Sequence, residues 1–432
     1  MMTPSLRNLA ATAFACALPL AACGGGPDAV SDPRGTGEPV ALPDSAGAEP
    51  EACVKESYAG LERAAFNKLA ARANLPLYWY ADENDNGAIE PAETLALLFH
   101  TTEGRWVEDG EFTPAFDAAF AKLLELSAGA DREGLDAAEA ERRALIAREL
   151  DQGRPTVVYN DLTGLSDEEK AVLGHLLAAS RVIDELFAIQ TGAAALADRI
   201  PADDPASRRA FDRNWGPECQ APKTEDEAAC SAIPGAPEPA VDAYPAALQE
   251  DDGFCDELAA RDDADELLAP FVVVRESGDD LEAVPITEAY ERRMEQVATE
   301  LEAAAAAIAD PGEKALKTYL TAAAEAFRDN DWEPADEAWA LMNASNSSWY
   351  VRVAPDETYW DPCNRKAGFH LTLARINAGS VAWQKKLTAV QQEMEDALAK
   401  LIGKPYRARR VAFHMPDFID IVTNAGNDRA PM

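Results

Sequence analysis

The sequence predicts an α+β fold that is predominantly helical, in which a helical N-terminal region is followed by a helical region with a small sheet. Segments rich in Ala, Leu and Glu recur at helical spacing along most of the chain, whereas runs rich in Val and aromatic residues are concentrated in roughly the last 160 residues. Hydrophobic residues make up 47% of the chain, which is enough to build real cores. No solenoid-type repeat is visible.

Residues 1–22 have the layout of a signal peptide. Arg7 precedes a small apolar run of about fourteen residues, which is shorter than the roughly twenty that a membrane-spanning helix needs. The run ends in Leu-Ala-Ala-Cys, which resembles the bacterial lipobox, so we expect cleavage after Ala22 and lipid on Cys23. The alternative is an ordinary cleaved signal followed by a chance cysteine. Gly24 favours an outer-membrane address in the cell envelope, on the periplasmic or the surface face.

Residues 23–57 are rich in Pro, Gly, Ala, Asp and Glu and predict a flexible tether. The whole chain carries a formal net charge of −38, which argues against nucleic acid or anionic lipid as a partner. Contact with the membrane is therefore expected through the N-terminal lipid. Solubility in an exposed setting explains the acidity better than a specific cationic partner does.

Within the next region, residues 58–105, a twelve-residue stretch matches the calcium loop of an EF-hand position by position. Oxygen-bearing side chains alternate along it, and Gly87 at the sixth position permits a left-handed turn. Calcium is therefore the expected cofactor, held by Asp82, Asn84, Asn86, Ala88 (through its carbonyl), Glu90 and Glu93. The alternative is a chance acidic turn in a very acidic protein.

The flanks of this loop predict an exiting helix from Ala92 to Phe99 and an entering helix that Pro76 shortens or kinks. Three charged ligands and the absence of a second loop predict weak affinity, about 10⁻⁴ to 10⁻³ M, and a structural role. A second acidic cluster at residues 329–333 lacks the glycine and predicts a turn between helices.

Helices are expected near residues 59–73, 113–128, 137–151, 166–191, 288–309, 312–328, 335–342 and 380–402. Ser166 and Glu169 have the spacing of a capping box. Residues 106–268 form a helical region whose polar, Pro-rich part, residues 200–265, predicts a long ordered loop. Cys219 and Cys230 flank part of that loop and are the expected disulfide.

A second disulfide is expected among Cys53, Cys255 and Cys363, with one thiol left over. None of the cysteine spacings suits a zinc cluster. Strands are expected at residues 270–275, 349–353 and 410–422, and residues 269–432 therefore form an α+β region.

Roughly the last 120 residues resemble the dipeptidyl-peptidase III family of zinc metallopeptidases. Glu357-Thr358-Tyr359-Trp360-Asp361-Pro362 is similar to the Glu-x-Tyr-x-Asp-Pro segment of that family, and a basic pair and Phe369 follow it. Residues 324–342 resemble the helical stretch that precedes this segment in bacterial members. Residues 418–426 resemble the turn into the Asn-containing substrate strand.

The sequence departs from the family at the metal. The zinc-binding helix of the family has a His-Glu-x-x-Gly-His motif, and none of the histidines at positions 100, 175, 370 and 414 has a partner at that spacing. Where the family often has Glu after the aromatic residue, this chain has His370. We expect no catalytic residues and no zinc ligands in this chain, and zinc only if a C-terminal half with that motif exists.

The resemblance implies that Tyr359 donates its hydroxyl to the substrate carbonyl and that Glu357 orients the same segment, so both are expected to bind substrate. The alternative for Tyr359 is a packing aromatic in a strand pair. The leading interpretation is a lipid-anchored, calcium-binding lipoprotein that resembles the N-terminal part of a dipeptidyl-peptidase III-like enzyme, binds peptides and does not hydrolyse them. The other interpretation is a calcium-stabilised surface or envelope protein without catalysis.

Overall fold

The computed structural model describes residues 58–97, 102, 104–412 and 418–429. By its contacts the chain divides into two units, Met1–Glu56 and Ser57–Met432. The predictions for the signal peptide, Cys23, the tether and Cys53 therefore lie outside the described residues. Across the described part, no helix is both long and apolar enough to cross a membrane.

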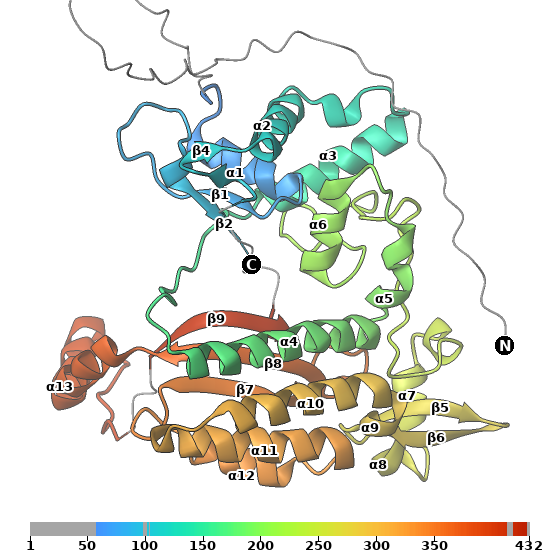
Figure 1. Cartoon of the computed structure of the whole chain (residues 1–432). Helices are drawn as coiled ribbons and strands as arrows, with labels where there is room; N and C mark the ends of the chain where they lie inside the picture. The colour runs from blue at the N-terminus through green and yellow to red at the C-terminus, as the bar shows by residue number, and fades with distance from the viewer. Residues whose placement is uncertain (1–57, 98–101, 103, 413–417, 430–432) are drawn as a thin grey trace, which may run out of the picture. The chain divides into compact units, whose positions relative to one another are not determined.

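The fold is α+β and predominantly helical, as the sequence predicts. Figure 1 shows long helices together with several small antiparallel sheets. The segment before residue 152 contains the long helices α1 (Arg63–Arg72), α2 (Pro114–Ser127) and α3 (Ala137–Asp151), with the 3-10 turn η2 (Ala130–Arg132) between the last two. Thr113 caps α2 and Asp136 caps α3 through hydrogen bonds from backbone N–H groups.

Two short hairpins in this segment correct the expectation that strands occur only late in the chain. β1 (Leu77–Trp79) pairs with β2 (Thr94–Ala96), and β3 (Val107–Glu108) pairs with β4 (Glu111–Phe112). The expected helices on either side of the candidate calcium loop are therefore wrong: β1 enters the loop, and η1 (Pro91–Glu93) and β2 leave it. Trp79 and Thr94 face each other across the hairpin, so tertiary pairing overrides the helical pattern.

The middle of the chain contains more helix than its composition indicates. After α4 (Asp167–Gln190) come α5 (Ala193–Leu196), η3 (Ala197–Arg199), α6 (Pro205–Asn214), η4 (Leu248–Glu250), α7 (Phe254–Ala259) and α8 (Ala264–Leu267). The expectation of a loop over residues 200–265 is thus wrong at α6 and α7. Asp204 caps α6 by accepting a hydrogen bond from the N–H of Ser207, and Pro205 occupies the first helical turn.

The C-terminal part is built on a three-stranded antiparallel sheet with the strand order β7-β8-β9. The strands are β7 (Trp349–Glu357), β8 (Gly368–Ile376) and β9 (Ile419–Gly426). The expected strand at 410–422 is therefore displaced: it begins at Ile419, and residues 413–417 lie outside the described residues. A separate hairpin, β5 (Val272–Ser277) with β6 (Asp280–Pro285), leads through α9 (Ile286–Ala289) into the helices.

Three helices form a layer on one face of this sheet: α4, α10 (Glu291–Ala307) and α11 (Lys314–Asp329). α4 lies along β8 and β9, while α11 contacts β7 (Figure 1). Phe369, Leu371 and Leu373 of β8 are fully buried in the hydrophobic core that joins sheet and helices. Burying side chains of this size stabilises the fold by about 1.5–3 kcal/mol each.

The connections around the layer agree with their sequence signals. Ser166 and Glu169 form the predicted capping box of α4. Asn330 has the left-handed conformation (φ 63°) and ends α11, and α12 (Glu333–Ala340) begins three residues later. The second acidic cluster is therefore a turn between two helices, as predicted. η5 (Pro311–Glu313) precedes α11, and α13 (Ala378–Ile402) connects β8 to β9.

Candidate functional site

The segment that resembles the peptidase motif forms the loop between β7 and β8, and Asp361 organises it. Asp361 is buried and accepts hydrogen bonds from the Tyr244 hydroxyl (2.8 Å) and from the N–H groups of Cys363, Arg365 and Lys366 (2.9–3.1 Å). Burial and the charge of Asp361 raise the pKa of Tyr244, which keeps its hydroxyl protonated as the donor. This carboxylate therefore fixes the path of the loop.

Covalent and steric contacts hold the same loop from two further sides. Cys363 is joined by a disulfide to Cys255 of α7, 108 residues away. Trp360 packs against Phe187 of α4 with ring centroids 5.7 Å apart. A Cβ atom at Gly368 would lie 2.9 Å from Trp360, so the first residue of β8 has no room for a side chain.

The two predicted substrate-binding residues lie at the open end of this rigid loop. Tyr359 is 69% exposed, which rules out the alternative of a packing aromatic. Glu357 is half-buried and pairs with Gly368 at the end of the β7–β8 ladder. The negative charge of Glu357 raises the pKa of Tyr359, so its hydroxyl is protonated at neutral pH. The structure therefore presents a phenol and a carboxylate side by side to solvent.

His370, which the sequence gives as a lone histidine, is buried and lies at the centre of an ionic network next to this loop. Its Nε2 is 2.9 Å from Asp356 and its Nδ1 is 2.7 Å from Asp428, which follows β9. Arg352 donates to Asp356 at 2.6–2.9 Å, and the Thr372 hydroxyl donates to Asp428 at 2.6 Å. The network joins all three strands.

Electrostatics makes this histidine a cation. Burial alone lowers the pKa of His370, but its hydrogen bonds to the two carboxylates outweigh burial and raise the pKa to about 9. Partial burial raises the pKa of Asp356, and the bonds from His370 and Arg352 overcome it and lower the pKa to about 2. Both ring nitrogens of His370 are engaged, so it holds charges in place and is not a free base.

The strand register places a row of polar side chains on the sheet face opposite the helical layer. Arg352 pairs with Thr372, and Thr372 pairs with Asn424, so one residue from each strand lies in the row. The Thr372 hydroxyl is 3.0 Å from the Asn424 side-chain oxygen. Side chains of a strand point alternately to the two faces of the sheet, so Thr372 lies on the polar face and its neighbour Leu371 lies on the apolar face, against the helices.

β9 is an edge strand, and it borders this polar face. Its Ile421 carbonyl accepts a hydrogen bond from Asn160 (2.6 Å), and the Gly426 N–H donates to Asp184 of α4 (2.7 Å). Between these two points no strand among the described residues pairs with residues 422–425 on the side away from β8. An extended segment of a few residues can add there by main-chain hydrogen bonds.

The candidate calcium loop is stabilised by hydrogen bonds among its own residues. Asp82 accepts from the N–H groups of Asn86 (3.1 Å) and Gly87 (3.2 Å), and Gly87 has φ +70°. Asn84 and Asn86 both donate to the carboxylate of Glu90 at 3.0 Å. These contacts bring four of the six predicted ligand residues into one turn: Asp82, Asn84, Asn86 and Glu90.

Glu93, the predicted closing ligand, is turned inward. It is 2% exposed and accepts hydrogen bonds from the Trp79 indole (3.1 Å) and the Glu83 N–H (2.7 Å). Ala88 lies against Ala59 in an isolated bridge. The carboxylates of Asp82, Glu90 and Glu93 do not all lie within 4.8 Å of one another, so a bound cation would have to draw them together.

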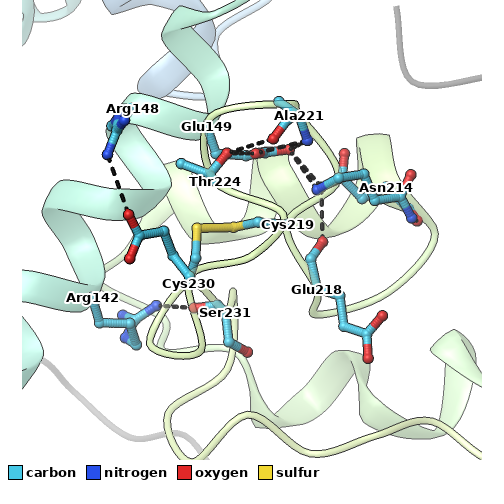
Figure 2. Close-up of a disulfide and its surroundings, with 12 residues drawn as sticks. Arg142, Arg148, Glu149, Asn214, Glu218, Cys219, Ala221, Thr224, Cys230 and Ser231 are labelled. Atoms are coloured by element: carbon cyan, nitrogen blue, oxygen red, sulfur yellow. Dashed lines mark hydrogen bonds and ion pairs between the residues drawn. A yellow bond between two sulfur atoms is a disulfide. The ribbon is translucent and has the colours of Figure 1, made fainter.

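The predicted pair Cys219–Cys230 is joined by a disulfide, which lies beside the buried carboxylate of Glu149 (Figure 2). Glu149 accepts hydrogen bonds from Asn214 (3.0 Å), the Ala221 N–H (3.1 Å) and the Thr224 hydroxyl. Burial raises the pKa of Glu149, but these bonds prevail and lower it.

The described residues do not form a site that fits the zinc ion of the family that the sequence resembles. Glu149, Cys219 and Cys230 are the one group of three potential ligands that converges there, and both sulfur atoms are bonded to each other. His370 has no free ring nitrogen.

The sequence alone does not identify His370 as part of the site, although this position departs from the family that the chain resembles. Its partners lie 14 and 58 residues away, and no spacing rule connects them. It also left open the partner of Cys363, which the structure identifies as Cys255. The position of His370 directly after the aromatic of the motif was the one available signal.

No protein-family model matches this sequence, and no curated protein matches it. Solved structures do match it, among them dipeptidyl-peptidase III from Caldithrix abyssi (25% identity, TM-score 0.54, 66% of this chain and 53% of that chain) and from Corallococcus sp. strain EGB (25% identity, TM-score 0.52, 67% and 54%). The chain thus spans about half the length of each. It has a dipeptidyl-peptidase III-like fold over about two thirds of its own length.

Proposed function

We propose that this chain binds short peptides in extended form along β9. The observation that carries the proposal is the stretch of open edge at residues 422–425, which lies between two capped backbone groups and beside a polar sheet face. Strand addition supplies affinity through main-chain hydrogen bonds, and the short opening limits the bound segment to a few residues. The likeness to dipeptidyl-peptidase III structures supports a peptide as the ligand.

In this proposal Tyr359 and Glu357 supply specific contacts, because their loop leads into β8 at the end where His370 pairs with Gly426 of β9. Tyr359 is exposed and protonated, so its hydroxyl can donate to a peptide carbonyl, as the family resemblance implies. Asp361 and the Cys255–Cys363 disulfide keep the loop from moving when a ligand arrives. A preformed site of this kind lowers the ordering cost of binding.

The test is a titration of fluorescently labelled tetrapeptides, followed by anisotropy, with N-methylated peptides as the probe. Methylation at alternate residues removes the N–H groups that face β9, so one set of positions should lose about tenfold or more in affinity and the other set little. Equal losses at all positions, or no binding at all, would contradict strand addition.

A matched pair of variants tests the role of Tyr359. Tyr359→Phe keeps the ring and removes the donor, and it should weaken peptide binding about three- to tenfold. Tyr80→Phe changes another exposed tyrosine (40% exposed), which lies beside the candidate calcium loop, and it should have no effect. We further propose that this chain alone does not hydrolyse the bound peptide. Hydrolysis of dipeptidyl-arylamides that a chelator abolishes would contradict that proposal.

We also propose that lipid on Cys23 holds the protein at the cell envelope. The tetrad that ends at this cysteine supports the proposal, as does the Pro- and Gly-rich segment after it. Metabolic labelling with a fatty acid should mark the wild type, and Cys23→Ala should abolish the label. An unlabelled wild-type protein would remove the anchor.

A calcium site at residues 82–93 remains the proposal for the N-terminal part. The twelve-residue pattern, the left-handed Gly87 and the cluster of oxygen atoms around Glu90 support it. Calcium there would stabilise the hairpin that β1 and β2 form, and it has no part in peptide binding.

A further inference from the structure

The long helix α13 has little to pack against. Of its 25 residues only Glu395 is buried. Its contacts run along one side, where the chain returns: Glu395 accepts from the Tyr406 hydroxyl (2.6 Å) and the Arg409 N–H (3.0 Å), and Gln392 accepts from the Val411 N–H (2.9 Å). Helices of this length normally owe their stability to a packed apolar face, and α13 has no such cover among the described residues.

The opposite side of α13 is a continuous apolar stripe, which we call the α13 stripe. Large side chains there are strongly exposed: Trp383 by 62%, Met394 by 56% and Leu401 by 85%. The members of the stripe follow one another at intervals of four, three, four, three and four residues: Trp383, Leu387, Val390, Met394, Ala397 and Leu401. This is the heptad spacing of a coiled coil, in which every third or fourth residue of the helix points into the interface.

The charge of α13 differs from that of the rest of the molecule. The helix carries three basic residues and three acidic ones, and so it is neutral within a chain of net charge −38: Lys385, Lys386, Lys400, Glu393, Glu395 and Asp396. Two copies of the acidic chain repel each other in general, whereas two α13 helices do not. The acidic residues beside the stripe also make an anionic membrane a poor partner.

From this geometry we propose that the α13 stripe is a dimer interface, and that a second copy of α13 covers it in a two-stranded coiled coil. The exposed parts of the apolar side chains sum to roughly 500–600 Å² per copy, or about 1,000–1,200 Å² for a pair, which reaches the size that a specific interface needs. A partner helix satisfies the heptad spacing, which binding to a flat lipid surface does not require.

The charges favour a parallel pair. An antiparallel pair would bring Lys386 near Lys400 of the second copy, and Glu393 near Glu393 of the second copy. In a parallel pair, Lys386 faces Gln391 and Glu393 faces Leu398, so no like charges meet. Equivalent residues then lie opposite each other, with Ala397 against Ala397 in one layer.

The experiment is sedimentation velocity of the full chain over a concentration series at low and high salt. We expect a monomer–dimer equilibrium that tightens as salt screens the repulsion between the acidic bodies. Met394→Glu places a charge in the middle of the stripe and should weaken dimerisation about tenfold or more. The matched control Ala389→Glu adds the same charge on the exposed side of α13 away from the stripe and should leave it unchanged.

A crosslink tests the arrangement. Ala397→Cys should form an intermolecular disulfide with its own equivalent under oxidising conditions, and Ala389→Cys should not. A chain that stays monomeric at about 100 μM in high salt would overturn the proposal. A dimer that Met394→Glu leaves intact, or a monomer that sediments with anionic vesicles, would overturn it as well.

Discussion

The loop at residues 82–93 and the network around His370 both contain clustered polar and acidic side chains. They differ in how far apart in the sequence the hydrogen-bonded partners lie. In the loop, Asp82 and Glu90 take their hydrogen bonds from residues no more than six positions away. In the network, His370 joins carboxylates 14 and 58 positions away. Local order can be read from a spacing pattern, whereas long-range order exists only after the sheet has formed.

Removing one long-range and one local disulfide gives the largest expected contrast. Cys255→Ser with Cys363→Ser opens a closure of 108 residues and should lower the free energy of unfolding by about 5 kcal/mol; Cys219→Ser with Cys230→Ser opens one of 11 residues and should lower it by about 3 kcal/mol. Denaturant titrations of both double variants measure this. Equal losses would contradict the distinction.

Changing His370 tests the network itself. His370→Ala leaves Asp428 without a cation and Asp356 with Arg352 alone, and it should cost about 3 kcal/mol. His175→Ala, which removes a half-exposed contact to Glu300, should cost less than about 1 kcal/mol. Because the folded pKa of His370 is raised to about 9, its contribution is complete below the unfolded pKa near 6.5 and is lost as the pH rises through about 9.

Unfolding measured at pH 6, 7, 8 and 9.5 checks that sign. The wild type should lose stability across this window, and His370→Ala should show a flatter profile. A wild-type profile no steeper than that of His370→Ala would show that the pKa of His370 is not raised in the folded protein.

Calcium binding tests the locally ordered cluster, the loop at residues 82–93. For a dissociation constant of about 1 mM, 10 mM calcium should stabilise the protein by about 1.4 kcal/mol, which a thermal shift detects and a chelator reverses. Glu93→Gln should remove the effect, and Asp331→Asn, in the acidic turn without the glycine, should keep it. A calorimetric titration without heat, together with an unchanged melting temperature, would remove the site.

Gly87→Ala should have the smallest effect. The backbone there has φ +70° and no atom lies within 4 Å of the added Cβ, so the cost of about 1 kcal/mol comes from conformation alone. Gly164→Ala, where φ is not positive and space is open, should change stability by less than half as much. Chemical denaturation of both variants measures the difference.

The sequence was sufficient for most helices because their signals are local. The capping box of Ser166 and Glu169, the turn at Asn330 and the periodic apolar positions of α4 each depend on residues within a few turns. It failed where tertiary pairing decides: residues 92–96 form η1 and β2 because β1 lies opposite them. In the site, Tyr359 and Glu357 were predicted from a motif, while His370 and the Cys255 partner required the fold.

The docking of α4 onto the sheet has a consequence for how the chain is made. Gln190 at the end of α4 bonds the backbone of Ala367 and Phe369, and Asp184 bonds Gly426, 242 residues later. During synthesis α4 therefore leaves the ribosome long before β8 and β9, the strands that it covers. Its apolar side stays exposed to solvent until those strands have been made. A precursor of this design would depend on holding chaperones, and a nonsense codon before residue 419 would remove β9, one of the two strands that α4 contacts.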